Sequence, residues 1–276
     1  MTTSTALRTN RVPEPTDAFW LVKLLTTGMG EALSDHLVTR FDPVPTVLVT
    51  AALFVAVLGA QLTTTRFRRW SYWATVSMVG VFGTMVADVV HVALGVPYLL
   101  STPVFLVVLV AVFVLWRRTE GTIDVHTITS TRRQAFYWAA VIATFAMGTA
   151  AGDLLASTLG LGYLAGGLVF VAVMALVVLA RVGNVLGPVA AFWTAYVLTR
   201  PIGASFADWF AVSPERGGLG AGTGTVSAVL VLAIVGAVAF THAGAPRTAP
   251  TARSPHRRRR TRGRRATGSP SPNRES

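Results

Sequence analysis

The chain has 276 residues, of which 52% are hydrophobic and only 13% are charged. Soluble domains are about a quarter charged, so this composition argues against a soluble fold. The net charge of +12 comes largely from arginines in the last 30 positions, and the lack of cysteine excludes disulfides, thiolate metal sites and cysteine nucleophiles.

Eight apolar segments follow a polar start. Residues 1–17 contain no apolar stretch of the kind found in a cleaved signal peptide, so the first hydrophobic segment is expected to remain as an anchor. A bilayer core about 30 Å thick requires about 20 apolar residues per helix. The segments of that length are 18–39, 44–64, 71–94, 97–116, 135–158, 161–181, 189–211 and 223–243. The predicted fold is therefore all-α, a polytopic membrane protein of eight transmembrane helices.

The distribution of arginine predicts the orientation. Short loops rich in Lys and Arg stay on the cytoplasmic side. The connections on one side of the predicted bundle hold nearly all the basic residues, and those on the other hold only Arg40 and Arg216. Both termini are therefore predicted to be cytoplasmic. The Arg-rich segment 244–276 is predicted to be a disordered cytoplasmic tail that contacts anionic lipids, or else only fixes topology, and it lacks the aromatics and the folded module expected for nucleic-acid binding.

A repeated motif runs through the odd-numbered segments. Tryptophan, glycine and aspartate recur with one spacing, Trp, nine residues, Gly, four residues, Asp. The four copies are Trp20-Gly30-Asp35, Trp73-Gly83-Asp88, Trp138-Gly148-Asp153 and Trp193-Gly203-Asp208. Each copy is followed by a segment without acidic residues, which predicts four parallel two-helix repeats at about 18–64, 71–116, 135–181 and 189–243. A small residue lies four positions after each glycine, a pattern typical of close helix packing, and the tryptophans are predicted near the cytoplasmic interface.

The carboxylates of these segments suggest a function. Charges at such depth cost about 2.5–3.5 kcal/mol and usually face the protein interior or water. One interpretation is a cation or proton pathway around a pseudo-fourfold axis, formed by Asp35, Asp88, Asp153 and Asp208 with Lys23 and Arg200. The other is that each aspartate lies shallow enough to hydrate, or caps a neighbouring repeat.

The first and fourth repeats carry additional charges. Glu31 and Asp35 share a helix face and His36 is adjacent, so these three side chains are candidate ligands for a divalent cation. A Lys23–Glu31 pair is the competing arrangement. Arg200 precedes Pro201, which is expected to kink its helix, and Arg200 is predicted to face Asp208 or the aspartate of another repeat.

These repeats resemble a bacterial family of uncharacterised membrane proteins. The resemblance rests on pairs such as Phe19-Trp20 and Tyr137-Trp138 with their glycines and aspartates, and it covers about residues 11–243. It implies four tandem two-helix repeats in a bacterial inner membrane and no established activity.

Two functions remain open. The first is a small cation or proton-coupled transporter that uses the repeated aspartates. The alternative is a non-transporting membrane scaffold or sensor in which the Trp, Gly and Asp residues are structural. No enzyme motif is present, so an enzyme is not expected, and no cofactor is predicted beyond a divalent cation.

Overall fold

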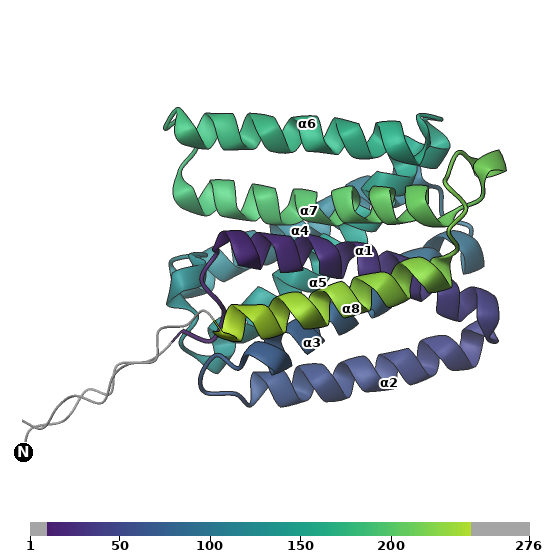
Figure 1. The fold of residues 1–276 in the computed structure, drawn as a ribbon. Coiled ribbons are helices and arrows are strands. Elements are labelled where there is room, and N and C mark those ends of the chain that lie inside the picture. Colours follow the sequence, from purple (N-terminus) through teal and green to yellow (C-terminus); the bar gives the residue numbers. More distant parts are fainter. Residues whose placement is uncertain (1–9, 244–276) are drawn as a thin grey trace, which may run out of the picture. The chain divides into compact units, whose positions relative to one another are not determined.

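The structure, a computed structural model, describes residues 10–243, and within them every regular element is helical (Figure 1). The long helices are α1 (Asp17–Arg40), α2 (Pro43–Leu62), α3 (Arg69–Asp88), α4 (Tyr98–Glu120), α5 (Thr131–Asp153), α6 (Gly162–Val182), α7 (Pro188–Ala211) and α8 (Thr223–Ala243). The all-α prediction is confirmed. The predicted tail at 244–276 and the first nine residues of the predicted segment 1–17 lie outside the described residues.

Six of these helices are long and apolar enough to cross a membrane: α2, α3, α4, α5, α6 and α8. The other two, α1 and α7, are equally long but are not among these six, and they carry the buried charged residues Lys23, Glu31 and Arg200. Hydropathy therefore identifies the six helices that lack these buried charges and not the two that hold them.

Local signals set the helix boundaries. The Thr16 side chain accepts a hydrogen bond from the Phe19 N–H at the start of α1, as an N-cap does. The helix α4 continues four residues past the predicted end at 116 and stops at Gly121, whose φ of 74° a residue with a side chain rarely adopts. The predicted windows 71–94 and 135–158 each contain an α-helix followed by a π-helical turn, at Val89–Ala93 and Leu154–Thr158.

The odd-numbered helices form a closed ring. Helix α1 contacts α3, α3 contacts α5, α5 contacts α7, and α7 contacts α1. The even-numbered helices pack outside this ring, α2 mainly on α3, α4 on α5, α6 on α7 and α8 on α1. The second helix of each repeat thus packs chiefly on the first helix of the next repeat, and the last repeat closes on the first.

The motif glycines show how the ring is closed. Each of them meets the residue that lies three positions before the motif glycine of the next repeat. These pairs are Gly30 with Gly80, Gly83 with Phe145, Gly148 with Arg200, and Gly203 with Thr27. A Cβ atom on Gly30 would lie 2.7 Å from the Gly80 backbone, and one on Gly148 would lie 2.6 Å from Arg200 Cγ. The same contact made four times gives the ring a pseudo-fourfold arrangement.

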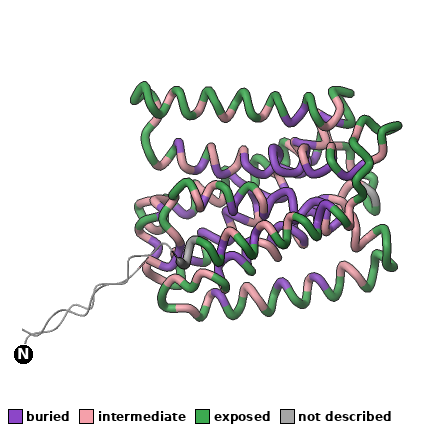
Figure 2. Tube along the Cα trace, viewed as in Figure 1, coloured by how far each residue is buried: buried purple, intermediate pink, exposed green. Residues whose placement is uncertain are grey.

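Burial separates the two sets of helices. Figure 2 shows buried residues concentrated on the inner helices, whereas α2 and α6 are largely exposed. The exposed side chains of the outer helices are mostly large and apolar, for example Leu48, Val107, Leu176 and Leu232. Soluble proteins rarely expose contiguous apolar surface of this extent, and such surface marks contact with a membrane or with another protein.

The N-terminal segment is bound to the connection between α4 and α5. Asn10 Nδ2 donates to the Val125 carbonyl at 3.0 Å, and the Arg11 guanidinium donates to Gln134 Oε1 at 3.0 Å. In the same place Glu14 lies 3.1 Å from His126 Nε2. We call residues 10–16, together with this connection, the N-terminal clasp. It lies at the end where α1 begins, which holds most of the arginines in the described range 10–243, and we call it the arginine-rich end.

Candidate functional site

Five carboxylates of the odd-numbered helices gather at the opposite end of the ring. This acidic cluster consists of Glu31, Asp35, Asp88, Asp153 and Asp208. Oxygen atoms of Glu31, Asp35 and Asp208 all lie within 4.8 Å of one another. Glu31 and Asp208 are buried and the other three are half-buried. We call this the aspartate end.

The remaining two aspartates face the same cluster. Asp88 and Asp153 both interact electrostatically with Glu31, and Asp88 also interacts with Asp153. Tyr98, at the start of α4, also interacts with the Asp153 carboxylate. All four motif aspartates thus interact electrostatically with Glu31.

A π-helical turn follows each of these two aspartates. Asp88 ends α3 and Asp153 ends α5, and in both places the next five residues widen into a π-turn. Such turns are rare and are often found at functional sites, because they redirect a side chain that a regular helix would hold elsewhere. In the first turn His91 Nε2 lies 3.0 Å from Ser101 Oγ on α4.

Glu31, one member of the acidic cluster, also forms a buried ion pair. Arg200 is fully buried, and its Nη2 forms an ion pair with Glu31 Oε2. The same nitrogen donates to Thr84 Oγ1 at 2.5 Å and to Thr149 Oγ1 at 2.7 Å, while Nη1 donates to the Thr27 carbonyl at 3.4 Å. One guanidinium therefore links all four inner helices. Both threonine hydroxyls donate back to their own helices, which leaves their oxygens free to accept from the arginine.

The partners of Arg200 occupy one position of the repeat. Glu31, Thr84 and Thr149 each follow directly after a motif glycine, and Ala204 holds this position in the fourth repeat. Arg200 itself lies three residues before its motif glycine, the position that contacts the glycine of the preceding repeat. The symmetric ring thus brings three polar side chains to a single arginine. Arg200 was predicted to face Asp208 or another aspartate, but its ion pair in the structure is with Glu31.

Lys23 is buried without a hydrogen bond. Its Nζ lies 4.4 Å from the ring centroid of Phe145 and 4.3 Å from that of Tyr196. No hydrogen-bond acceptor for Nζ is found among the described residues. The alternative Lys23–Glu31 pair is therefore not formed. Two aromatic faces attract the ammonium group instead, through cation–π interactions that are stronger where water is excluded.

Buried aromatic side chains fill the ring on the side of Lys23 towards the arginine-rich end. The Tyr72 and Tyr137 hydroxyls lie 2.5 Å apart, and both residues are fully buried. Three of the motif tryptophans, at positions 73, 138 and 193, are buried in this aromatic layer, and Trp20 is half-buried. Trp193 Nε1 donates to the Ile123 carbonyl of the α4–α5 connection. The tryptophans at positions 73, 138 and 193 therefore pack inside the protein and do not face its surroundings.

The candidate metal ligands are only partly brought together. Glu31 and Asp35 lie close to each other, but the third carboxylate beside them is Asp208 from α7. His36 lies against Gly224 of α8, whose Cβ position would be 2.9 Å from the imidazole Cε1. A cation at this end would therefore meet three carboxylates, the hard ligands preferred by Mg²⁺, Ca²⁺ and Mn²⁺. The Glu31–Arg200 pair already neutralises one of them.

Sequence reasoning missed several residues of the site. Thr84, Thr149, Phe145, Tyr196 and Tyr98 were not singled out, because threonine and aromatic side chains are common in apolar helices. One signal could have identified the first two. Aligning the repeats on their motif glycines places Thr84 and Thr149 at the position of Glu31.

The chain matches one known family. The sequence model described as Repeat of Unknown Function (DUF347) matches residues 18–67, 71–122, 136–183 and 191–243. No curated protein and no solved structure matches the chain. Each match contains one Trp, Gly and Asp motif and the two helices that form a repeat of the ring. The resemblance noted from the sequence is thereby confirmed, and the chain belongs to this family of four tandem repeats of unknown function.

Proposed function

We propose that all eight helices cross the bacterial inner membrane with both termini cytoplasmic, and that the protein is a small cation or proton-coupled transporter. Six helices have the length and hydropathy for a span. The two others, α1 and α7, are inner members of the ring, where neighbouring helices cover their polar residues. The excess of arginine at one end supports a cytoplasmic position for that end.

One observation carries the transport proposal. Carboxylates of the first and fourth repeats, Glu31, Asp35 and Asp208, meet at the aspartate end next to Arg200, and Asp88 and Asp153 of the other two repeats interact electrostatically with Glu31. Buried ionisable groups inside a membrane are expensive, and they usually mark ion or proton pathways. A ring held together by glycine contacts alone needs none of these charges.

The geometry supports a competition at Glu31. A proton or cation that enters the acidic cluster reaches Glu31 by way of Asp35 and Asp208 and then competes with Arg200 for its carboxylate. Losing that partner frees the Arg200 guanidinium from one of its four contacts. Because the guanidinium also bonds α3 and α5, the occupancy of Glu31 alters contacts with every inner helix.

Lys23 and the aromatic layer bound the pathway. From Asp35 to Lys23 is twelve residues on one helix, about 18 Å of a bilayer core of about 30 Å. Beyond Lys23 the buried tyrosines and tryptophans close the ring. The described state is therefore closed on the side of the arginine-rich end. Passage requires the aromatic layer to separate.

The alternative is a non-transporting scaffold or sensor, and that same closed layer favours it. Each motif glycine is used in helix packing, and the arginine-rich end is packed with large buried aromatics. In a scaffold the acidic cluster would only bind helices together. The two functions differ in whether the aspartates are needed for the movement of ions.

The test is ion flux into proteoliposomes that contain the purified full-length chain. Proton and divalent-cation uptake are measured for the wild type, for Asp88→Asn and Asp153→Asn, which remove a charge with little change in size, and for Glu215→Gln. The Glu215 control removes an exposed acid at the same end. Flux in the wild type and the control, with loss in both asparagine variants, supports transport. No flux, or flux that ignores both substitutions, leaves the scaffold.

A further inference from the structure

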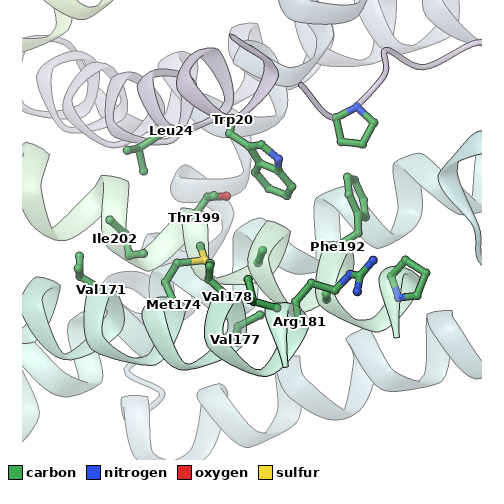
Figure 3. Close-up of a pocket in the computed structure, with 15 residues that line it drawn as sticks. Trp20, Leu24, Val171, Met174, Val177, Val178, Arg181, Phe192, Thr199 and Ile202 are labelled. Atoms are coloured by element: carbon green, nitrogen blue, oxygen red, sulfur yellow. The ribbon is translucent and has the colours of Figure 1, made fainter. Parts of the chain in front are cut away.

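A second site lies on the outside of the ring, in a groove between α1, α6 and α7. Its volume is about 690 Å³, within the range of small-molecule pockets. Trp20 and Leu24 of α1 form one wall, and α6 forms the other with residues such as Met174 and Val178 (Figure 3). Val178 and Val182 are also exposed at the surface, so the groove opens towards the surroundings of the bundle.

The groove is apolar with a single charge at its end. Nearly all its lining side chains are aliphatic or aromatic, and the only charged one is Arg181, near the end of α6. Arg181 is exposed, and its side chain forms no ion pair or hydrogen bond with any residue in the described range 10–243. It lies at the arginine-rich end, and Trp20 lies across the groove from α6.

The length of the groove fits one leaflet of a bilayer. From Arg181 to Val171, the lining residue of α6 farthest from it, is ten residues, or about 15 Å of helix. A bilayer core is about 30 Å thick, so one leaflet accounts for about 15 Å. The groove therefore extends from the level of the head groups to about the middle of the bilayer.

We propose that this groove binds one phospholipid with an anionic head group. An acyl chain lies between α1 and α6, and the phosphate group contacts the guanidinium of Arg181. Arginine recognises phosphate through paired N–H donors, and aromatic rings such as Trp20 are favoured at the level of the head groups. The lipid comes from the leaflet on the arginine-rich side. This inference rests on the membrane placement proposed above and does not depend on transport.

The position of the groove gives the lipid a role in the ring. Thr199 and Ile202 line the groove from α7, and between them Arg200 turns inwards to Glu31. Thr199 also accepts, through its carbonyl, a hydrogen bond of 3.0 Å from Thr27 of α1. The bound chain thus covers the contact between the first and fourth repeats, which no loop connects.

Lipid binding to the full-length protein can be measured directly by native mass spectrometry, with the protein in detergent and phosphatidylglycerol or phosphatidylcholine as added lipid. The wild type should retain one phosphatidylglycerol in preference to phosphatidylcholine. Arg181→Gln should bind it about fivefold more weakly, since one basic residue near a membrane surface contributes about 1 kcal/mol. Arg181→Lys should retain most of the binding. Arg118→Gln is the matched control, because Arg118 is exposed at the same end and does not line the groove.

A second variant tests the groove itself. Val178→Trp places a large ring in the opening and should abolish the single tight site, while an exposed position on α6 tolerates the substitution in the fold. Equal binding by the wild type, Arg181→Gln and Val178→Trp would overturn the proposal, as would equal affinity for the two lipids. Dimers that disappear in Val178→Trp, with lipid binding unchanged, would show that a second copy fills the groove and would also overturn it. A protein that binds lipid but shows no ion flux would reject transport and leave this site intact.

Discussion

Replacing Arg200 with glutamine should strongly destabilise the ring, because it leaves Glu31 as a buried carboxylate without its cation. The side chain of Arg200 is fully buried and that of Glu31 is 6% exposed, so solvent screens the pair very little. Removing one partner of a buried ion pair costs about 3–5 kcal/mol. Glu31→Gln alone should cost a similar amount, since it leaves Arg200 uncompensated.

The double variant is the sharper measurement. In Arg200→Gln with Glu31→Gln no buried charge remains, and two amides can bond to each other and to Thr84 and Thr149. The double variant should therefore be more stable than either single variant, with a coupling free energy of about 3 kcal/mol. Thermal unfolding in detergent, followed by intrinsic fluorescence and by loss of the monomer peak in size exclusion, gives the order of the four proteins. If the double variant instead loses as much stability as the two single variants together, Glu31 and Arg200 do not neutralise each other.

Three further predictions concern other parts of the chain. Gly30→Ala should destabilise the protein by about 1–3 kcal/mol in the same unfolding assay, because its methyl group would meet the backbone of α3, whereas Gly59→Ala in α2 meets nothing within 4 Å and should be neutral or slightly stabilising. Lys23→Met should leave stability unchanged or raise it, because a buried ammonium without a hydrogen bond is replaced by an apolar chain of similar length. The same variant should abolish proton flux, because methionine cannot carry a proton. The N-terminal clasp should loosen as pH rises, since the hydrogen bond to Asp124 raises the pKa of His126 above its ordinary value of 6.5. Hydrogen exchange of residues 10–16 should report this loosening, and His126→Gln should remove its dependence on pH.

Both His126 and Asp124 determine how the clasp responds to pH. Because the pKa of His126 is raised in the folded protein, its stabilising contribution is fully present below pH 6.5 and is lost as pH rises through the raised value. Partial burial alone would raise the pKa of Asp124, but bonds from the backbone N–H and imidazole of His126 lower it overall. Its contribution is therefore present above its ordinary value of 3.8 and lost in stronger acid. The clasp should be tightest between these two pH values. Stronger protection of residues 10–16 from hydrogen exchange at higher pH would contradict this account.

The results for the Gly30 and Lys23 variants show whether each residue has a structural role. If Gly30→Ala and Gly59→Ala have the same effect, the close contact between α1 and α3 is not what the first glycine provides. If Lys23→Met lowers stability by several kcal/mol, the lysine is a structural part of the aromatic layer and carries no protons. Retained flux in that variant would exclude Lys23 from the pathway and leave the aspartates to be judged separately.

The sequence by itself determined the helices, the repeats and the end at which the acids lie. Apolar runs of about 20 residues and a motif with one spacing are local signals, and they depend only on the geometry of a single helix. For that reason the four aspartates were predicted at one level, and the family was recognised from its repeat. The boundaries of α4 and the π-turns after Asp88 and Asp153 were missed, since hydropathy does not distinguish one kind of helical turn from another.

Only the tertiary structure decided which side chains meet. Glu31 and Arg200 are 169 residues apart, and either Lys23 or an aspartate was as reasonable a partner for one of them by spacing along a helix. The choice depends on the closed ring, in which each motif glycine admits the residue three positions before the next one. That contact fixes the rotation and height of all four inner helices together. It turns Arg200 towards Glu31, Thr84 and Thr149 and leaves Lys23 between two aromatic rings, because these are distances between helices that no periodicity within a helix can specify.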